Sequence, residues 1–248
     1  MPTRSAQTRV ALITGSSRGL GAVIAQNLAG QGYDLVLTAR GRQALEASTE
    51  ALAKYGVRIE ALAGDINDPE HRRQLAAAAR SLGSLDILIN NASDIGPSPL
   101  PPLAEYPLDA LARVFATNVI AQLGLVQAAL PLLRQSRGLI VNITSDAARG
   151  GYPGWGGYGA SKAALELVSL TLANELREDG VAVVTVDPGD MRTEMHQLGY
   201  PGEDISDRPL PDVTIPFWSW LFEQDWQAIS GQRFEAQADR WEVRHEAR

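Results

Sequence analysis

A tyrosine and a lysine stand four residues apart in the stretch GGYGASKAAL, residues 156–165. Residues four apart on a helix project from the same face, one turn from each other. Tyr158 and Lys162 would therefore point in one direction. A nearby positive charge favours the ionised form of a phenol, whose ordinary pKa is near ~10. The pair is a candidate for proton transfer to or from a reacting oxygen.

The residues around this pair have very little bulk. Small side chains would keep the space around Tyr158 open to a substrate and a cofactor, and they would also let a helix pack closely on a neighbour. For the Tyr158 and Lys162 pair taken alone, a chance surface pairing stays an alternative. The small residues are Gly156, Gly157, Gly159 and Ala160.

A second chemical motif, TGSSRGLG at residues 14–21, follows a short apolar run and opens a helical pattern. Its glycines present no side chain to phosphate oxygens, and the start of a helix offers free N–H groups and a positive dipole end. We predict a dinucleotide-binding loop, and the alternative is an ordinary tight turn. The predicted contacts here are Thr14, Gly15, Ser17, Arg18, Gly19, Leu20 and Gly21.

The second apolar run ends LVLTAR, at Ala39 and Arg40. An NAD-binding loop usually has a carboxylate about 20 residues on, bonded to the ribose 2′-hydroxyl. Ala39 cannot serve, whereas Arg40 and Arg18 would bind a 2′-phosphate through charge-assisted hydrogen bonds. We therefore favour NADP(H) over NAD(H). The alternative is that both arginines are solvated surface charges.

Short apolar runs alternate with helical patterns along the chain, which predicts strands joined by helices. Strand, helix, strand, repeated, is typical of a parallel sheet covered on both faces. The predicted fold class is α/β, a single Rossmann-type doubly wound domain over residues 1–248, with about seven strands and helices on both faces. The predicted strands are 10–15, 33–40, 58–65, 85–92, 138–145, 180–189 and, more weakly, 230–236.

Two irregular segments follow predicted strand ends, where open α/β sheets bind ligands. Residues 93–109 hold five prolines, and we interpret residues 190–230 as a substrate-loop insertion rich in aromatic residues. The late tryptophans fit a lid or a subunit contact equally well. Predicted pocket walls are residues 93–100, 146–157 and 190–225, with Tyr152, Trp155, Met191, Met195 and Leu198 as wall residues.

Composition excludes several function classes. The chain has 248 residues, 45% of them hydrophobic, a formal net charge of −7 and no cysteine. Thiol chemistry and disulfides are therefore excluded, and a nucleic-acid or anionic membrane surface is not expected. The uncharged stretch 114–133 contains polar residues and a proline, so we predict a helix buried on two faces rather than a membrane span.

The N-terminal residues show no signal-peptide pattern, and we expect a soluble cytoplasmic protein. No His and carboxylate group has metal-ligand spacing, so no metal is predicted. His71 and His196 are isolated in the sequence, and we interpret both as surface residues.

Seven motifs in register make the sequence resemble the short-chain dehydrogenase/reductase family over nearly the whole chain, more weakly after about residue 195. Single motifs of this kind are not decisive, but seven in order are specific. The motifs are TGSSRGLG (14–21), GDI (64–66), NNA (90–92), TN (117–118), Ser145, YGASK (158–162) and DPG (187–189).

The resemblance implies roles for particular residues. The catalytic set would be Asn118, Ser145, Tyr158 and Lys162. The remaining cofactor contacts, beside Tyr158 and Lys162, would be Asp65 and Ile66 at the adenine edge, Asn91 and Ala92 after the fourth strand, and Pro188, Gly189, Met191 and Thr193 near the nicotinamide amide. Asn90 would steady the end of the fourth strand against the cofactor. One departure is Ser93, where the family usually has a glycine at a turn.

The chemistry that suits this set is hydride transfer to a carbonyl, which creates an alkoxide that must receive a proton. Tyr158 would be the acid/base, and Ser145 would donate a hydrogen bond to the carbonyl oxygen as it becomes negative. In the family the lysine also holds the nicotinamide ribose, and Asn118 helps to organise a water that links the lysine to solvent. The reverse reaction needs a phenolate near neutral pH, which requires the pKa to fall by ~3 units.

We therefore predict an NADP(H)-dependent oxidoreductase of the carbonyl reductase or alcohol dehydrogenase type, acting on a small, partly apolar substrate. The alternatives are a non-catalytic NADP(H)-sensing regulator on the same fold and, less favoured, a structural interaction protein. A sensor has no need to keep Ser145, Tyr158 and Lys162. We also expect a homodimer or homotetramer, formed through the uncharged helix 114–133 or the small-residue helix from 158.

Overall fold

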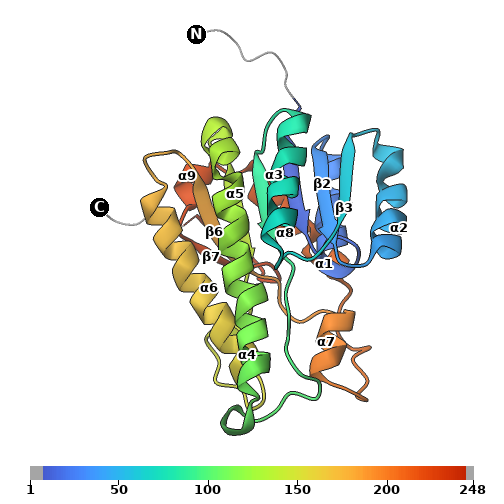
Figure 1. Cartoon of the computed structure of the whole chain (residues 1–248), viewed down its shortest axis with the longest axis vertical. Coiled ribbons are helices and arrows are strands. Elements are labelled where there is room, and N and C mark those ends of the chain that lie inside the picture. Colours follow the sequence, from blue (N-terminus) through green and yellow to red (C-terminus); the bar gives the residue numbers. More distant parts are fainter. Residues whose placement is uncertain (1–7, 244–248) are drawn as a thin grey trace.

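The seven predicted strands form one parallel sheet in the computed structural model of the chain, which describes residues 8–243 (Figure 1). Both ends of the predicted span 1–248 lie outside the described residues, as does most of the N-terminal polar stretch. The strands are β1 (Val10–Thr14), β2 (Asp34–Ala39), β3 (Ile59–Ala63), β4 (Ile87–Asn90), β5 (Leu139–Ile143), β6 (Ala182–Asp187) and β7 (Arg233–Glu235).

The spatial order of the strands is β3-β2-β1-β4-β5-β6-β7. The chain order reverses between β1 and β4, which pair in parallel with Leu12 opposite Leu88. Ligands of open α/β sheets bind outside the carboxyl ends of the strands at such a switch point. The predicted Rossmann-type fold class is confirmed, and the topology places the glycine loop after β1 beside the end of β4.

Helices cover both faces of the sheet (Figure 1). The helices on one face are α1 (Gly19–Gly30), α2 (Arg42–Leu52), α8 (Ile215–Glu223) and α9 (Trp226–Ile229), and those on the other are α3 (Pro69–Leu82), α4 (Leu108–Phe115), α5 (Ala121–Ser136) and α6 (Gly156–Glu175). The short helix α7 (Glu194–Gly199) stands apart from both layers.

Residues of β1 show how the two layers form. Ala11 and Ile13 belong to the core under α1, α2 and α8, whereas Val10 and Leu12 belong to the core under α3, α5 and α6. Side chains alternate between the faces of a strand, so a strand covered on both faces needs apolar residues at every position. All four residues are fully buried, which explains the nearly continuous apolar runs in the sequence.

One helical run within the described residues, Leu108–Ser136, is long and apolar enough to cross a bilayer by length and composition. It comprises α4, a π-helical turn at Ala116–Ile120 and α5. The run packs against α3 and α6 as part of one layer on the sheet. A sheet-covering helix accounts for this composition, in line with the predicted helix buried on two faces.

The aromatic segment after β6 differs from its prediction. Phe217 and Trp218 of α8 are fully buried in the core beside α1, and the Trp218 indole Nε1 donates to Thr214 Oγ1 at 2.9 Å. The Asn27 amide on α1 donates to Ser219 Oγ at 2.9 Å. Phe217 and Trp218 therefore belong to the core and do not form a lid, whereas a subunit contact by the rest of the segment stays a prediction. The reason is that the crossover from β6 to β7 must cover one apolar face of the sheet, a constraint that composition alone does not reveal.

Candidate active site

The glycine loop after β1 has the shape that an anion-binding loop needs. Gly15 has a left-handed φ of 66°, and a Cβ there would approach Asn91 Nδ2 at 2.8 Å. A Cβ on Gly21 would collide with the carbonyl oxygen of Gly15. Helix α1 begins at Gly19 with no side-chain cap and no acidic residue in its first turn. Its first N–H groups are thus open to an anion, and the loop fits a dinucleotide phosphate.

Thr14 and Asn91 fasten this loop to the end of β4. Thr14 Oγ1 accepts from the Asn91 and Ala92 N–H groups, both at 2.9 Å. The Asn91 amide donates to the carbonyl of Thr14 at 2.8 Å and to that of Gly15 at 3.1 Å. These predicted cofactor contacts therefore have a structural role as well, since they hold the two strand ends that flank the cleft.

The two arginines predicted to bind a 2′-phosphate lie in different surroundings. Arg40 follows β2, is exposed, and has no ion pair with another described residue. Arg18 is ion-paired with Glu194 of α7. Both partners are more than 60% exposed, so the pair is weak and open to exchange. Arg18 therefore links the glycine loop to α7 in this state, and Arg40 is the free cation beside the loop.

Other predicted cofactor residues occupy the same edge of the sheet. Asp65 is exposed after β3, and its carboxylate accepts from the Asn67 N–H at 2.9 Å, while Ile66 is buried. Ser17 is half-buried and Leu20 is buried. Thr193 caps α7 by accepting from the His196 N–H at 3.1 Å.

Hydrogen bonds from Gln237 hold the turn after β6 in place. Gly189 has a φ of 74°, and the Gln237 amide donates to the carbonyls of Pro188 at 2.9 Å and Asp190 at 3.0 Å. Met191, by contrast, is buried in the core under α1 and α8. Its predicted contacts with substrate and cofactor stay predictions.

Tyr158 and Lys162 lie on one face of α6, as the spacing predicts. The Lys162 Nζ is 5.5 Å from the centre of the Tyr158 ring and donates to the carbonyl of Ile143, at the end of β5, at 2.8 Å. Tyr158 is 8% exposed and Lys162 is 1% exposed. The pair is therefore held inside the carboxyl edge of the sheet rather than on the surface, which removes the alternative of a chance surface pairing.

The electrostatics of this pair differ from the expectation. Burial raises the pKa of the Tyr158 phenol well above its ordinary value, hydrogen bonding to Ser93 and Ser145 opposes this, and Asp187 and Asp146 add to it. Burial also lowers the pKa of Lys162 to about 7. The neighbouring lysine does not lower the pKa of the phenol in this state, because both groups are desolvated together and desolvation disfavours both charges. In this state Tyr158 is a proton donor at neutral pH.

Ser145 follows β5 by two residues and is half-buried. Its Oγ donates to Asp146 Oδ1 at 2.9 Å and accepts from the Ala147 N–H at 3.1 Å. The hydroxyl lies beside the Tyr158 phenol, as predicted. Its hydrogen is directed at an exposed carboxylate, where water can replace it, so the hydroxyl can turn to another oxygen.

Asn118 is fully buried in the π-helical turn between α4 and α5. Its Oδ1 accepts from Ser93 Oγ at 3.0 Å and from the Asp94 N–H at 2.7 Å. Its Nδ2 donates to the Asp94 carbonyl at 2.8 Å and to Ser161 Oγ at 2.9 Å. All hydrogen-bonding groups of the Asn118 side chain are bonded to other residues of the chain, and these bonds hold the segment after β4 against α6. π-Turns are often found at functional sites.

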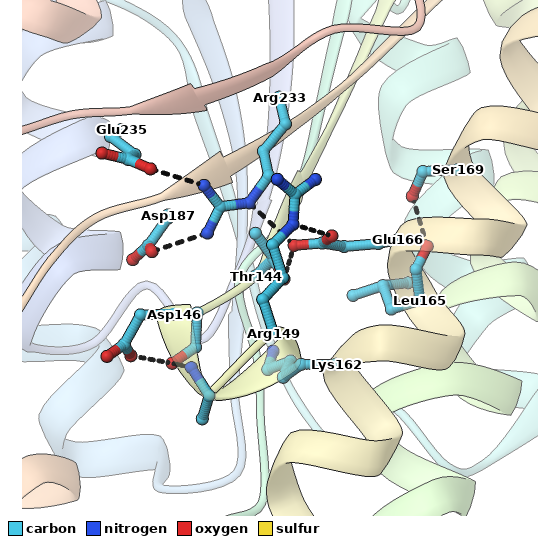
Figure 2. Close-up of polar contacts among 12 residues, drawn as sticks. Thr144, Asp146, Arg149, Lys162, Leu165, Glu166, Ser169, Asp187, Arg233 and Glu235 are labelled. Atoms are coloured by element: carbon cyan, nitrogen blue, oxygen red, sulfur yellow. Dashed lines mark hydrogen bonds and ion pairs between the residues drawn. The ribbon is translucent and has the colours of Figure 1, made fainter. Parts of the chain in front are cut away.

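A buried ion-pair network supports the strand ends beneath the site, and Figure 2 shows it between α6, β6 and β7. Arg233 Nε lies 2.9 Å from Glu166 Oε1, and an Arg233 terminal nitrogen lies 2.8 Å from Asp187 Oδ2. Thr144, which precedes Ser145, donates to Glu166 at 2.8 Å. Burial acts to raise the pKa of Glu166, but hydrogen bonds from Thr144, Arg233 and Arg149 outweigh it and hold the pKa below its usual range.

No local sequence pattern indicates this network, because Arg233 and Glu166 are 67 residues apart. Glu166 is nevertheless one helical turn after Lys162, on the face of α6 that carries the pair. Arg233 therefore ties α6, which carries Tyr158 and Lys162, to the ends of β5 and β6.

Asn90 joins the end of β4 to the neighbouring strand β5. Its amide donates to Asn142 Oδ1 on β5 at 2.8 Å, and Asn142 donates to Ser169 Oγ on α6 at 2.7 Å. Asn90 is 1% exposed. It therefore steadies the end of β4 against β5 and α6, and its role toward the cofactor stays a prediction.

Comparisons with known proteins settle the family. The short chain dehydrogenase family profile matches residues 9–203. The chain belongs to the short chain dehydrogenase family. A rhamnolipid-biosynthesis 3-oxoacyl-[acyl-carrier-protein] reductase of Pseudomonas aeruginosa is 33% identical over 239 residues, 92% of this chain and 90% of that protein.

Solved structures agree with this short chain dehydrogenase over most of its length. A short chain dehydrogenase from Pseudomonas syringae has a TM-score of 0.86 and 35% identity, covering 92% of this chain and 94% of that one. A short chain dehydrogenase from Shigella flexneri, solved as a complex with NADP, has a TM-score of 0.86 and 31% identity. The match covers 93% of this chain and 97% of that one.

The Tyr158 ring of this short chain dehydrogenase packs in an apolar cluster. Ile95, Ala147 and Tyr158 form one buried cluster, with Trp155 and Met195 packed against it. The Trp155 ring stands edge-on to Tyr158 at 5.9 Å between centroids and also contacts Tyr200 at 5.8 Å. Of the predicted wall residues, Trp155 and Met195 are brought to the phenol.

Tyr152 and Leu198 have about half of their surface exposed. Tyr152 lines an apolar groove of about 830 Å³ between residues 100–104 and the start of α6.

Neither His71 nor His196 of this short chain dehydrogenase is an exposed surface residue, contrary to the prediction. His71 is 5% exposed, and its Nε2 lies 2.8 Å from Thr38 Oγ1 on β2. His196 packs on Tyr200 at 5.0 Å between ring centroids. Burial lowers the pKa of both rings. Within residues 8–243, no group of three or more His, Cys, Asp or Glu side chains has the arrangement of a metal site.

Proposed function

We propose that this short chain dehydrogenase is an NADP(H)-dependent carbonyl reductase or alcohol dehydrogenase that uses Tyr158 as its acid/base. The observation that carries the proposal is the buried pair of Tyr158 and Lys162, in which the Lys162 Nζ lies 5.5 Å from the centre of the Tyr158 ring. The pair lies beside Ser145, at the edge of the sheet where the uncapped start of α1 also lies. The residues that would hold the cofactor are the glycine loop, Arg40, Asp65 and the turn at Pro188.

The bound cofactor supplies the hydride, and the chain supplies the proton and the geometry. Burial raises the pKa of the Tyr158 phenol, so its Oη carries a proton at neutral pH and can give it to an alkoxide oxygen. The Ser145 hydroxyl can turn from Asp146 to the same oxygen as negative charge develops there. Lys162, with its pKa lowered to about 7, can lose or take up a proton near neutral pH.

The wall around the phenol supports an apolar substrate. Ile95, Trp155 and Met195 supply aliphatic and aromatic surface within the cluster that contains Tyr158. The Pseudomonas aeruginosa relative is a 3-oxoacyl-[acyl-carrier-protein] reductase, which supports a ketone as the reacting group. We propose a ketone or secondary alcohol with an apolar group on at least one side.

The preference for NADP(H) predicts a specific effect at Arg40. We expect Arg40→Ala to raise the Kd of NADPH about 10- to 100-fold, because hydrogen bonds to a charged group contribute about 1.5–3 kcal/mol. The Kd of NADH, which lacks the 2′-phosphate, should change less than about threefold. Titration of cofactor fluorescence measures both constants. Arg177→Ala, at an exposed arginine after α6, is the control and should change neither Kd. If Arg40→Ala weakened the binding of both cofactors equally, the proposal that Arg40 binds the 2′-phosphate would be wrong.

We propose that the chain forms a homodimer or homotetramer through the outer face of α6 and the neighbouring π-turn. Leu167 and Leu170 of α6 and Ile120 of the turn are 66%, 48% and 64% exposed. Sedimentation should give two or four times the chain mass, and Leu167→Glu should shift the mass toward that of the monomer. Val213→Glu, at an exposed residue elsewhere, should not. A monomeric intact protein would contradict this.

The experiment that tests the proposed function is NADPH oxidation against a panel of ketones, aldehydes and quinones, preceded by measurement of NADPH binding. We expect tight binding and turnover of apolar ketones. Tight binding with no turnover on a broad panel would favour the alternative, an NADP(H)-sensing regulator.

A further inference from the structure

Ser93 occupies the turn after β4 where the family usually has a glycine. A glycine is needed only where φ is strongly positive or where a Cβ would collide. Among the described non-glycine residues, Arg137 alone has a positive φ, so Ser93 adopts its conformation without that strain. The backbone path is therefore ordinary, and the position adds a hydroxyl to the site instead of distorting it.

The Ser93 hydroxyl is held from one side by Asn118. Ser93 Oγ donates to Asn118 Oδ1 at 3.0 Å, and the Asp94 N–H donates to the same oxygen at 2.7 Å. Asn118 is itself fixed to α6 by the bond from its Nδ2 to Ser161 Oγ at 2.9 Å. Because Asn118 is fully buried and has all its partners, the position of Ser93 Oγ is determined by α6 and the π-turn together.

On its other side the Ser93 hydroxyl meets the Tyr158 phenol. The next apolar residue of the segment, Ile95, packs in the same buried cluster as the Tyr158 ring. Hydrogen bonding to Ser93 is the largest effect that opposes the rise in the Tyr158 pKa caused by burial, ahead of Ser145. The Ser93 hydroxyl is thus a hydrogen-bonding partner of both the Asn118 carbonyl oxygen and the Tyr158 phenol.

The hydroxyl hydrogen of Ser93 can be donated to either of two acceptors, Asn118 Oδ1 or the Tyr158 oxygen. While Tyr158 keeps its proton, the phenol can donate to Ser93 Oγ, whose own hydrogen points at Asn118 Oδ1. When Tyr158 gives its proton away, that hydrogen can turn to the phenolate. Asn118 Oδ1 is not left without a partner, because the Asp94 N–H stays bound to it at 2.7 Å. No covalent bond of Ser93 is made or broken.

We propose that Ser93 is a positioning residue of the active site, which orients the Tyr158 phenol and donates a hydrogen bond to the phenolate after proton transfer. The inference rests on the proposed function, in that Tyr158 is the group that transfers the proton. It adds a second hydroxyl beside Ser145 and gives Asn118 a link to Tyr158 through a side chain.

The test combines a spectroscopic arm and a kinetic arm on Ser93→Ala. The first is the ¹³C resonance of the Tyr158 ring carbon that bears oxygen, in tyrosine-labelled protein at neutral pH, assigned by its loss in Tyr158→Phe. The second is the pH profile of alcohol oxidation with NADP⁺, a direction that needs the phenolate. Ser93→Thr keeps the hydroxyl. Ser98→Ala is the matched control in the same segment, because Ser98 Oγ donates to the Leu198 carbonyl at 2.8 Å, away from Asn118.

We expect Ser93→Ala to shift the Tyr158 resonance and to move the rising limb of the pH profile by ~1 unit to higher pH, since a hydrogen bond to a charged group is lost. Ser93→Thr should restore both, and Ser98→Ala should change neither. An unchanged Tyr158 resonance in Ser93→Ala would overturn the inference, as would an unmoved limb. If the resonance shifts but the intact protein oxidises no alcohol, the contact stands and the proposed function fails.

Discussion

Replacing Tyr158 by Phe should lower turnover about 100- to 10,000-fold and leave the Kd of NADPH within about threefold. A positioned general acid contributes a factor of this size, and the substitution removes only the phenol oxygen that carries the transferred proton. The ring contacts with Trp155 and Ile95 remain, so the cavity should keep its shape. Steady-state rates with NADPH, together with cofactor binding measured by fluorescence, separate the two effects.

Tyr33→Phe is the matched control for that variant. Tyr33 is fully buried, and burial raises its pKa to about 12. It lies just before β2, at the amino ends of the strands and therefore on the side of the sheet away from Tyr158. Its hydroxyl has no hydrogen-bond partner among the described residues. Loss of that oxygen should be neutral or stabilising, with turnover unchanged. Equal turnover in Tyr158→Phe and Tyr33→Phe would end the assignment of Tyr158 as the acid/base.

Replacing Lys162 by Met should abolish most turnover and make the protein more stable. Lys162 is 1% exposed. Within the described residues its Nζ donates to one acceptor, the Ile143 carbonyl. Burial lowers its pKa to about 7, so the folded protein holds this proton less well than the unfolded chain does. Methionine has a similar length and no charge to bury. We expect the free energy of unfolding at pH 7 to rise by roughly 2–4 kcal/mol.

The pH dependence of this gain has a definite sign. Below pH about 7 the lysine is charged in both states, and the full cost of burying the charge is present. As pH rises above 7 the folded protein has released the proton, and the unfolded chain releases it only near ~10.4. The advantage of Lys162→Met should therefore shrink as pH rises from 7 toward 10. Denaturant unfolding at several pH values measures it.

Lys54→Met provides the comparison for that prediction. Lys54 is exposed beside Tyr55, and its replacement should change the free energy of unfolding by less than about 0.5 kcal/mol at any of these pH values. If Lys162→Met were less stable than the intact protein at pH 7, the claim that the site holds an unfavourable buried lysine would be wrong.

The sheet could be predicted from the sequence because β1, β2, β4, β5 and β6 are apolar at most positions, and the structure confirms all seven predicted strands. The pairing of Tyr158 with Lys162 followed from helical spacing, and the open start of α1 from its glycines. These are local features, in which neighbouring residues in the chain decide the geometry.

The parts that were missed depend on residues far apart in the chain. Arg233 on the weakly predicted β7 meets Glu166 of α6, and Ser93 meets Asn118, 25 residues on. The direction of the Tyr158 pKa depends on how deeply α6 is buried, which no spacing reveals. Phe217 and Trp218 were misassigned for the same reason, because an apolar segment at a strand end is equally suited to a lid and to a core helix.

The central claim is that hydride passes from NADPH to the carbonyl carbon of a substrate while Tyr158 supplies the proton. The most direct test uses NADPH deuterated at the transferring position of the nicotinamide ring, with an apolar ketone turned over by the intact protein. We predict one deuterium on the carbinol carbon of the product alcohol, with none incorporated there from heavy water when unlabelled NADPH is used. An alcohol without the label, or tight NADPH binding with no alcohol formed from any ketone, would contradict the account.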